Sequence, residues 1–309
     1  MPEGVGRKPL WLKKPVPSAG PVRKMERLLR KHGLHTVCES ASCPNLGSCF
    51  EQGTATFLIM GDVCTRGCGF CGVRTGVPEA LDPSEPERVA EAAVSLGLRH
   101  VVVTSVTRDD VADGGASHFV ATIRAIRRHQ PMATVEVLVP DFAGREANAE
   151  QVLAESPEVF GHNVEMVPRL YKLARSLADY DRSLSLLGWA AKEGRGLVKT
   201  GCMVGLGETE AEMDRVLQDV AEAGAAIVTI GQYLQPRSSS VPVAEYVQPE
   251  MFERYRRKGE TLGLQVQAGP FVRSSFRAEE SLTLALKTRA ALSVGCRATI
   301  ARTYGGLAE

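Results

Sequence analysis

The stretch TFLIMGDVCTRGCGFC occupies residues 56–71 and joins a short apolar segment to three closely spaced cysteines. Residues 56–60 are apolar or β-branched, which predicts a buried β-strand. The cysteines that follow, Cys64, Cys68 and Cys71, have the spacing C-x3-C-x2-C. Glycines between them let the backbone pass close to a bound group, so a compact loop can bring the three sulfurs together. The sequence therefore predicts a strand that leads directly into a metal-binding loop.

A second cysteine triplet lies just before this stretch. Cys38, Cys43 and Cys49 have the spacing C-x4-C-x5-C, so six of the eight cysteines of the chain fall within residues 38–71. Such clustering indicates thiolates gathered for a metal. A structural zinc site has four protein ligands, and a cubane iron–sulfur cluster has one thiolate per iron. Each triplet therefore leaves one ligand position for another group. The alternative explanations of these cysteines are a zinc knuckle or incidental buried thiols.

The segment from Gly61 to Cys71 resembles the cluster loop of the radical S-adenosylmethionine (SAM) enzymes. This resemblance implies that Cys64, Cys68 and Cys71 hold a [4Fe-4S] cluster. It also implies that the amino and carboxylate groups of SAM chelate the fourth iron. Phe70 would then shield one face of the cluster from water.

The first triplet resembles the auxiliary-cluster motif of lipoyl synthases, since CESASCPN at residues 38–45 is followed by Cys49. Other segments resemble this family in the same order, namely KPLWL at 8–12, GLHTV at 33–37, VTSVTRDD at 103–110, DGG at 113–115, MVGLGET at 203–209, GQYLQP at 231–236 and RSSF at 273–276. The resemblance implies a second [4Fe-4S] cluster, held by Cys38, Cys43, Cys49 and Ser275. Phe276 stands where the family usually has tyrosine. A further serine run, at residues 238–240, is expected to be an ordinary loop.

Short β-branched segments alternate with helical patterns along the rest of the chain. The expected strands cover residues 56–60, 100–104, 134–139, 159–163, 197–203 and 226–232. Helical periodicity lies between them, as in residues 86–96, 117–129 and 210–223. Six βα units in succession predict parallel strands with right-handed crossovers, and hence an α/β fold, a partial (β/α)6 TIM-type barrel. The site should lie at the carboxyl ends of the strands.

The two ends of the chain fall outside this pattern. Residues 1–53 are expected to form an N-terminal extension that carries the first triplet, and residues 54–247 to form the barrel. Residues 248–309 are expected to form a helical tail that brings Ser275 back across the barrel mouth. We therefore predict one catalytic domain with wrapped termini.

Polar residues near the expected strand ends are candidates for binding SAM, on the basis of position alone. Thr104 and Ser105 could accept the SAM ammonium group, and Lys199 could pair with its carboxylate. Asn163 and Glu165 could hold the ribose or the methionine part, although capping or a buried polar bond explains them equally well.

Other features have ordinary structural explanations. His162 is expected to be a satisfied packing residue beside its strand. Gly205 and Gly207 predict a tight turn that either approaches SAM or is purely structural, because Glu210 stands where a dinucleotide-binding loop has its third glycine. Cys202 and Cys296 are expected to act as small hydrophobic residues. The basic run at 254–258 predicts a solvated helix face, with docking of an acidic carrier protein as the lesser alternative.

Composition and charge are those of a globular protein and argue against nucleic-acid binding and membrane insertion. The 309 residues are enough to form one large barrel, and 44% hydrophobic and 24% charged residues are ordinary for a globular protein. A net charge of +1 gives no general attraction to nucleic acid. The sequence shows neither an apolar run long enough to span a membrane nor a signal peptide. Because metal-binding thiols must stay reduced, we expect a cytoplasmic enzyme that binds neither nucleic acid nor membrane.

The resemblance to lipoyl synthases implies insertion of two sulfur atoms, at C6 and C8 of an octanoyl group. The cluster at Cys64, Cys68 and Cys71 would cleave SAM to a 5′-deoxyadenosyl radical, which abstracts hydrogen from these unactivated carbons. No acid or base can deprotonate such carbons, so no catalytic His or Glu is expected. Sulfur would come from the auxiliary cluster, in which a serine oxygen suits iron less well than a thiolate does.

The same resemblance implies protein partners. The octanoyl group is expected on a lysine of a lipoyl carrier protein domain, with an external electron donor such as ferredoxin or flavodoxin and an iron–sulfur cluster carrier as further partners. One alternative is another radical SAM enzyme, such as a biotin synthase-like sulfur inserter or an RNA methylthiotransferase, against which the first triplet and residues 273–276 argue. The other is a zinc-stabilised interaction module without enzymatic activity.

Overall fold

A parallel β-sheet dominates the computed structural model, which describes residues 7–15 and 17–288. Its strands follow the order β1-β2-β5-β6-β7-β8-β9-β10. Their bounds are β1 (His35–Thr36), β2 (Thr56–Ile59), β5 (His100–Ser105), β6 (Thr134–Leu138), β7 (Val159–Gly161), β8 (Leu197–Val204), β9 (Ile227–Gln232) and β10 (Gln265–Gly269). The six predicted strands are thus confirmed as β2 and β5 to β9, and each pairs in parallel with the next.

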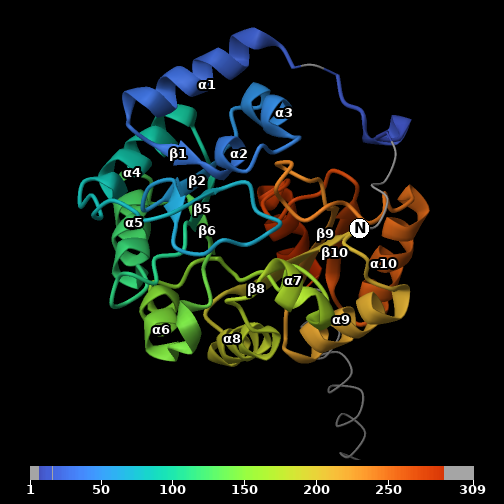
Figure 1. Cartoon of the computed structure of the whole chain (residues 1–309). Coiled ribbons are helices and arrows are strands. Elements are labelled where there is room, and N and C mark those ends of the chain that lie inside the picture. Colours follow the sequence, from blue (N-terminus) through green and yellow to red (C-terminus); the bar gives the residue numbers. More distant parts are fainter. Residues whose placement is uncertain (1–6, 16, 289–309) are drawn as a thin grey trace, which may run out of the picture.

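Helices surround the outside of this sheet, as Figure 1 shows for α4, α5, α6, α8, α9 and α10. Their bounds are α4 (Glu85–Leu96), α5 (Ala116–His129), α6 (Glu146–Ala154), α8 (Tyr180–Glu193), α9 (Glu210–Glu222) and α10 (Pro249–Thr261). A short helix, α7 (Tyr171–Ala174), lies between β7 and α8 in the chain. Strand, helix and parallel strand in succession give the predicted partial barrel.

Local sequence explains why these elements form. In α9, the Thr209 side chain accepts a hydrogen bond from the Glu212 backbone amide, and the Glu212 carboxylate accepts one from Thr209 in return. This capping box satisfies amides at the helix start. The helix then buries an apolar stripe at helical spacing, consisting of Met213, Val216, Leu217 and Val220. The strands β2 and β5 contribute fully buried side chains such as Phe57, Ile59 and Val101 to the core between sheet and helices.

The C-terminal tail differs from the prediction of a helical segment. After α10 the chain forms β10, which pairs in parallel with β9 from Gln265 to Gly269 and extends the sheet beyond residue 247. The sequence QVQAG has a single β-branched residue, so its strand signal is weak. Residues 278–288 are helical, as expected. Cys296 and the rest of residues 289–309 lie outside the described residues.

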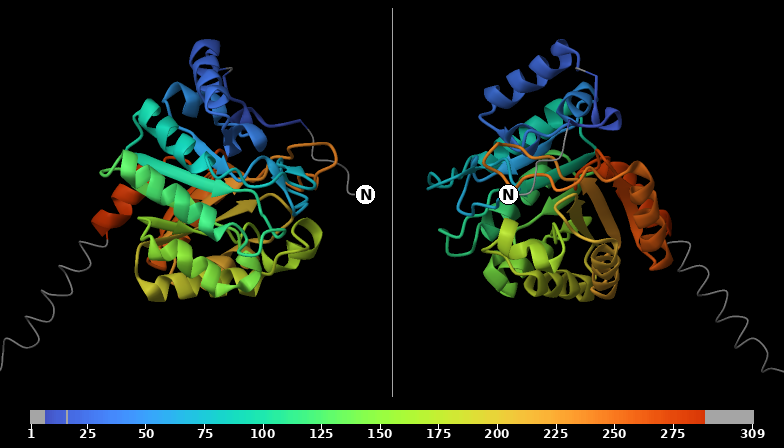
Figure 2. Two further views of the ribbon diagram at one scale, coloured as in Figure 1. Left: turned by 90° about the vertical axis from the view of Figure 1, so that its left-hand side faces the viewer. Right: turned by 45° about the vertical axis from the view of Figure 1, so that its right-hand side comes forward.

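The N-terminal segment lies beside the first barrel strand. It contains α1 (Ala19–Lys31), β1, α2 (Val37–Ser40) and α3 (Leu46–Glu51). Strand β1 pairs antiparallel with β2, which joins this segment to the edge of the sheet. Figure 2 shows α1 standing away from the barrel in both views. In the described part of the chain, none of the helices combines the length and apolar character needed to cross a membrane.

Candidate functional site

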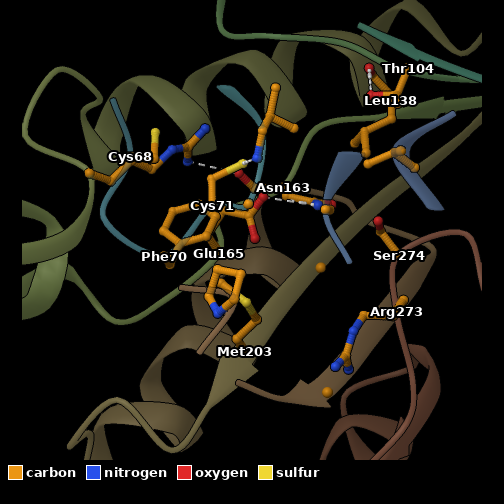
Figure 3. A pocket seen from close by; sticks show the side chains of 18 of the residues that line it. Cys68, Phe70, Cys71, Thr104, Leu138, Asn163, Glu165, Met203, Arg273 and Ser274 are labelled. Carbon is orange, nitrogen blue, oxygen red and sulfur yellow. Dashed lines mark hydrogen bonds between the residues drawn. The ribbon is translucent and has the colours of Figure 1, made fainter. Parts of the chain in front are cut away.

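A cavity of about 310 Å³ opens at the carboxyl ends of the barrel strands. Its lining includes Ser105 at the end of β5, Leu138 at the end of β6 and Gln232 at the end of β9. Figure 3 shows the side chains of Cys68 and Phe70 on one side of this cavity and those of Arg273 and Ser274 on the other. The cavity therefore joins the predicted cluster loop, the strand ends and the C-terminal tail.

Cys64, Cys68 and Cys71 all line this cavity, as does Phe70. Two short strands hold the ends of their loop together, because β3 (Val63–Cys64) pairs in parallel with β4 (Arg74–Thr75). Within the loop, the Cys71 amide donates a hydrogen bond to the Cys68 carbonyl at 3.0 Å. The sequence spacing thus brings the three thiols to one side of one cavity, as predicted for cluster ligands.

Backbone amides point at two of these sulfurs. The Cys64 sulfur accepts hydrogen bonds from the amides of Arg66, at 3.4 Å, and Thr107, at 3.3 Å. The Cys71 sulfur accepts one from the amide of Val73 at 3.5 Å. Amide–sulfur hydrogen bonds stabilise thiolate ligands and tune the reduction potential of iron–sulfur clusters.

Two of the triplet thiols, Cys38 and Cys71, resist ionisation in the metal-free protein. Burial raises the pKa of Cys71 to about 11 and that of Cys38 to about 12. Because the ligand form is the thiolate, metal binding at these positions must release protons. The seven cysteines in the described part of the chain are all free thiols.

Among residues 7–15 and 17–288, no three His, Cys, Asp or Glu side chains converge as the ligands of a single metal ion do. In a cubane cluster each thiolate binds a different iron, so the sulfurs stand apart from one another. The three half-buried thiols on one cavity wall and the amide–sulfur hydrogen bonds fit an iron–sulfur cluster at the second triplet.

Four of the five residues predicted to bind SAM line the same cavity, namely Thr104, Ser105, Asn163 and Glu165. The Ser105 hydroxyl is buried and has no hydrogen-bond partner among the described residues. Such an orphaned polar group indicates a ligand that satisfies it. The Thr104 hydroxyl already donates to the Leu138 carbonyl at 3.0 Å, and the Asn163 amide donates to Glu165 Oε1 at 3.1 Å. Burial raises the pKa of Glu165, which Arg175 partly opposes.

The structure corrects the prediction for Lys199, which is not among the residues that line the cavity. Its ammonium group is buried and lies 2.7 Å from Glu136 Oε1. His100 Nε2 lies 3.4 Å from the other carboxylate oxygen of Glu136. A buried lysine that neutralises a buried carboxylate is not free to pair with a ligand.

Arg175 is a cation on the cavity wall that the sequence analysis did not identify. It follows α7, lines the cavity, and donates from Nη1 to the Asn163 carbonyl at 3.0 Å. No motif marks it in the sequence, because it lies outside the segments that resemble the family. Unlike the Lys199 ammonium, its guanidinium thus lies on the cavity wall.

Both ring nitrogens of His162 have protein partners, as expected for a satisfied packing residue, although His162 and Cys202 also line the cavity. The Nδ1 of His162 lies 2.9 Å from the Val139 carbonyl oxygen, and its Nε2 lies 3.0 Å from the Ser183 hydroxyl. Burial lowers the pKa of His162 to about 4, so the ring is neutral at neutral pH. Cys202 is likewise buried in the core, as predicted.

The turn at Gly205 and Gly207 belongs to the fold rather than to the cavity. Both glycines have positive φ angles, of 98° and 102°. A Cβ atom at Gly205 would lie 2.5 Å from the Glu245 carbonyl oxygen, which only glycine avoids. Neither glycine is among the residues that line the cavity. Of the two alternatives for this turn, the structure therefore supports the structural one.

The basic run on α10 is neutralised by neighbouring carboxylates. Arg254 pairs with Asp214 at 2.8 Å, and Arg257 pairs with Glu253 at 2.9 Å. Arg256 pairs with Glu253 at 2.5 Å. These ion pairs support the expected solvated helix face and leave little positive charge to attract an acidic carrier.

The first triplet lies in the N-terminal segment, on the side that contacts the C-terminal tail. Cys38 is on α2 and Cys49 is on α3. The Thr56 hydroxyl donates a hydrogen bond to the Ser275 hydroxyl at 2.7 Å, and the Thr56 backbone bonds to the Cys38 thiol. Ser275 and Cys38 thus share Thr56 as a neighbour, whereas Ser274 lines the cavity. The shared contact with Thr56 is consistent with the predicted place of Ser275 beside the first triplet.

The buried side chain of Asn45 connects the N-terminal segment to the C-terminal tail. Asn45 Nδ2 donates to the Phe271 carbonyl at 2.7 Å, and Asn45 Oδ1 accepts a hydrogen bond from Lys14. The Lys14 ammonium also lies 4.5 Å from the centre of the Phe271 ring. We call these three residues, Lys14, Asn45 and Phe271, the terminal clasp. The clasp holds the tail against the loop that carries Cys43.

Comparisons with known proteins agree with this site. The chain matches the family model of the Radical SAM superfamily over residues 58–220. The lipoyl synthase of Chlorobaculum tepidum is 51% identical over 281 residues, which cover 90% of this chain and 97% of that protein. The lipoyl synthase of Caldanaerobacter subterraneus subsp. tengcongensis is 54% identical over 282 residues, which cover 90% of this chain and 98% of that protein.

Solved structures with similar folds are more distant in sequence. Streptococcus suis SuiB bound to S-adenosylmethionine has a TM-score of 0.53 at 12% identity, covering 72% of this chain and 53% of that one. Methylornithine synthase (PylB) has a TM-score of 0.51 at 13% identity, covering 88% of this chain and 77% of that one. These two likenesses concern the fold alone. From the family match and the identity over nine tenths of its length, the chain belongs to the lipoyl synthase family of the radical SAM superfamily.

Proposed function

We propose that this chain acts as a lipoyl synthase at the cavity on the barrel mouth. It inserts sulfur at C6 and C8 of an octanoyl group carried on a lysine of a lipoyl carrier protein, and it uses SAM and two [4Fe-4S] clusters as cofactors. One observation carries this proposal: the second cysteine triplet, the free Ser105 hydroxyl and residues of both terminal segments line one cavity.

Cys64, Cys68 and Cys71 would hold the cluster that binds SAM. When bound there, the cluster supplies the electron that cleaves SAM and so provides the radical that abstracts hydrogen from the substrate. The protein would hold SAM in a fixed orientation next to the cluster. Ser105 offers its unpaired hydroxyl to the ammonium group of SAM, and Arg175 offers its guanidinium to the carboxylate.

Asn163 and Glu165 offer further polar atoms on the cavity wall, next to Arg175. Their side chains are hydrogen-bonded to each other, which fixes both orientations before a ligand arrives. Groups held in place in this way cost little to order when the ligand binds. We assign this pair to the ribose or to the methionine part of SAM.

Apolar side chains form much of the remaining wall, including Val106, Leu138, Val139, Met203 and Tyr233. Such a wall accommodates a hydrocarbon chain and excludes water. Excluding water and other hydrogen donors protects a reactive species from side reactions. The same wall therefore serves both the octanoyl chain and the hydrogen abstraction.

Cys38, Cys43, Cys49 and Ser275 would hold the auxiliary cluster, which supplies the sulfur. Lys14 and Arg273 interact electrostatically with Cys43, so two cations lie near a site that gathers negative thiolates. Ser275 is oriented by the hydrogen bond from Thr56. A hydroxyl ligand on a surface-wrapped tail can leave without disturbing the barrel.

Three further parts of the proposal concern the setting of the reaction. Ferredoxin or flavodoxin serves as the electron donor, and an iron–sulfur carrier protein rebuilds the auxiliary cluster. The reaction takes place in the cytoplasm, because thiols that bind a metal must stay reduced. The free state of the seven described cysteines supports this placement.

An anaerobic assay tests the proposal directly. Protein reconstituted with iron and sulfide is incubated with SAM, a reductant and an octanoyl-lysyl peptide, and the peptide is analysed by mass spectrometry. We expect a product with two added sulfur atoms. SAM cleavage without any added sulfur, or purified protein that binds zinc instead of iron, would contradict the proposal.

A further inference from the structure

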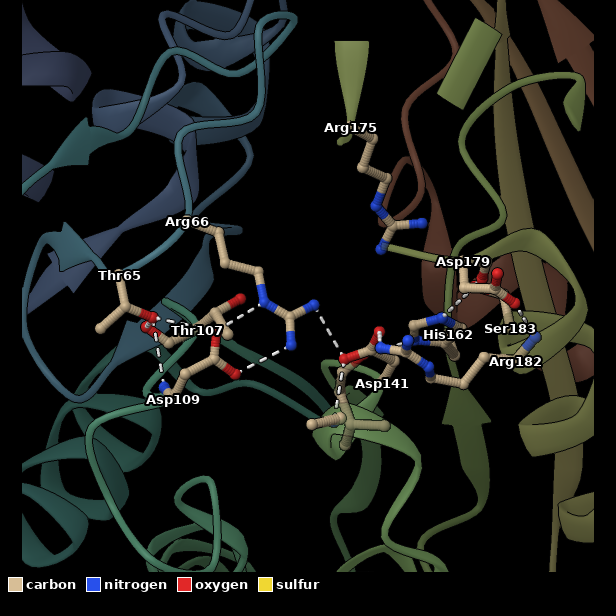
Figure 4. A network of polar contacts seen from close by, with 12 residues as sticks. Thr65, Arg66, Thr107, Asp109, Asp141, His162, Arg175, Asp179, Arg182 and Ser183 are labelled. Atoms are coloured by element: carbon tan, nitrogen blue, oxygen red, sulfur yellow. Dashed lines mark hydrogen bonds and ion pairs between the residues drawn. The ribbon is translucent and has the colours of Figure 1, made fainter. Parts of the chain in front are cut away.

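Arg66 lies between two of the cluster-loop cysteines, yet its side chain is only 7% exposed and is fully paired. Its Nε and Nη2 bind both carboxylate oxygens of Asp109, at 2.6 and 2.8 Å. Its Nη1 lies 2.8 Å from Asp141 Oδ1. Figure 4 shows the guanidinium between these two carboxylates, pointing from the cluster loop into the barrel mouth.

The two carboxylates differ in how firmly they are held. The side chain of Asp141 has no exposed surface, whereas that of Asp109 is 40% exposed. Asp141 also accepts hydrogen bonds from the Ala143 amide, at 3.1 Å, and from Arg182 of α8, at 3.0 Å. Asp141 therefore connects Arg66 to the loop after β6 and to a barrel helix. A buried carboxylate with several partners forms a more rigid anchor than an exposed one.

A second set of contacts attaches the loop to the residues after β5. The Thr65 amide and hydroxyl both donate to the Thr107 carbonyl, at 3.1 and 3.0 Å. The Asp109 amide donates to the Thr65 hydroxyl at 3.2 Å. The Thr107 amide in turn donates to the Cys64 sulfur at 3.3 Å. All these contacts are made by protein groups alone, so they hold the loop in place before any metal binds.

We propose that Arg66 is a positioning residue for the cluster, with Asp141 as its main anchor. The arginine fork fixes the segment from Cys64 to Cys68 over the barrel, so the sulfurs do not have to be ordered when iron binds. This inference rests on the proposed function, since it takes Cys64, Cys68 and Cys71 as the cluster ligands. Arginine suits the task because its planar fork binds two carboxylates at fixed angles, which lysine cannot do.

A chain with a single cluster site allows the test. In the full chain with Cys38, Cys43 and Cys49 all replaced by Ala, every iron bound reports on the second triplet. Into this background we would introduce R66K, R66Q, D141N and D109N. R182Q is the matched control, because it removes the other arginine on Asp141 without touching the cluster loop. The measurements are iron per chain, the rate of iron loss to a chelator, the EPR signal of the reduced cluster with and without SAM, and the melting temperature of the iron-free protein.

We expect R66Q, R66K and D141N each to speed iron loss by about tenfold, the lower end of the range for residues that orient metal ligands. Their EPR signals should differ from the parent signal, while the iron-free melting temperatures of R66K and the parent agree. D109N should have a smaller effect, and R182Q should leave iron loss and the EPR signal unchanged. If D141N does not fold, R66K carries the test.

Three results would overturn the inference. Parent-like iron loss in R66K would mean that a positive charge suffices and that the fork positions nothing. Equal effects of R182Q and D141N would mean that Asp141 acts through general packing. If the background chain itself bound no iron, the ligand assignment under the proposed function would be wrong, and this inference would fall with it.

Discussion

The two cysteine triplets are anchored in different ways. The loop with Cys64, Cys68 and Cys71 is attached to the barrel by contacts to nearby strand ends, such as that between Arg66 and Asp109, 43 residues apart. The site with Cys38, Cys43 and Cys49 depends on contacts that the C-terminal tail makes with the N-terminal segment and with the start of β2. Thr56 and Ser275 are 219 residues apart, and Asn45 and Phe271 are 226 residues apart.

This difference matches the different fates of the two clusters. Under the proposed function, the cluster that binds SAM is used repeatedly, and its loop is attached to the barrel mouth through Arg66 and Thr65. The auxiliary cluster gives up its sulfur, and its site is closed by a tail whose contacts can open locally while the barrel stays folded. A site that must be dismantled and rebuilt is thus made from segments that can separate.

The largest expected effect comes from removing either triplet. Replacing Cys64, Cys68 and Cys71 together by Ala should halve the bound iron and abolish SAM cleavage. Replacing Cys38, Cys43 and Cys49 should also halve the iron and abolish sulfur insertion, yet leave SAM cleavage measurable. Iron analysis and quantification of 5′-deoxyadenosine check both. Loss of all iron in either variant would show that the two sites are not independent.

The next largest effect is expected from replacing Ser275, with Ser274 as its control. S275A should lower sulfur insertion by at least about tenfold, as expected for loss of a metal ligand, while SAM cleavage changes little. S274A, which alters the neighbouring residue on the cavity wall, is the control and should be much milder. The two rates are measured on the same samples. Equal effects of both substitutions would mean that Ser275 is not the ligand.

Variants of Arg175 and Lys199 test which of these two barrel residues contributes to SAM binding. R175Q should raise the KM for SAM by about tenfold, because a hydrogen bond to a charged group is lost. K199A should leave that KM unchanged. Steady-state SAM cleavage at varied SAM concentrations distinguishes them. A raised KM in K199A alone would restore the sequence-based assignment that the structure overturns.

K199A should act on stability instead. Removing one partner of a buried ion pair costs about 3–5 kcal/mol in the free energy of unfolding, which urea titration measures. Burial opposes the shift, but the Lys199 charge lowers the pKa of Glu136 below its usual value. The stability from this pair is therefore complete above the ordinary glutamate pKa and is lost as the pH falls through the lowered one. K199A should lose that acid dependence; an unchanged profile would show that the pair contributes nothing.

The smallest effect is expected at the terminal clasp. N45A removes the hydrogen bonds to Phe271 and Lys14 and should cost about 1–2 kcal/mol. It should also speed iron loss from the auxiliary site and leave the other cluster unaffected. S48A is the control, because the Ser48 hydroxyl bonds to the Asn45 carbonyl and does not reach the tail. Faster loss from both sites at once would show that the clasp supports the whole fold.

Local signals account for the part of this structure that the sequence predicted. The β-branched segments gave the six barrel strands, and the cysteine spacing located both triplets. Strand β10 was missed because QVQAG has little β propensity, and only pairing with β9 makes it a strand. Lys199 was misassigned because sequence shows that a residue lies on a strand but not its depth in the barrel. Gly201, two residues further along β8, does line the cavity.

Residues whose roles depend on the arrangement of distant segments could not be predicted. Arg175 follows a short helix and has no motif, and its place on the cavity wall depends on the packing of α7 against the cluster loop. Asp141 is an ordinary aspartate in the sequence, and its importance follows from its burial between Arg66 and Arg182. In both cases tertiary packing, rather than local pattern, determines the role.

The central claim is that the sulfur comes from the auxiliary cluster at Cys38, Cys43, Cys49 and Ser275. Protein reconstituted with heavy sulfide and assayed in unlabelled sulfide tests it most directly, with mass spectrometry of the first-turnover product. The account predicts that both inserted sulfurs are heavy and that each chain makes no more than about one lipoyl group before it stalls, since the cluster is consumed. A product with mainly light sulfur would contradict the account, because sulfur would then enter from solution.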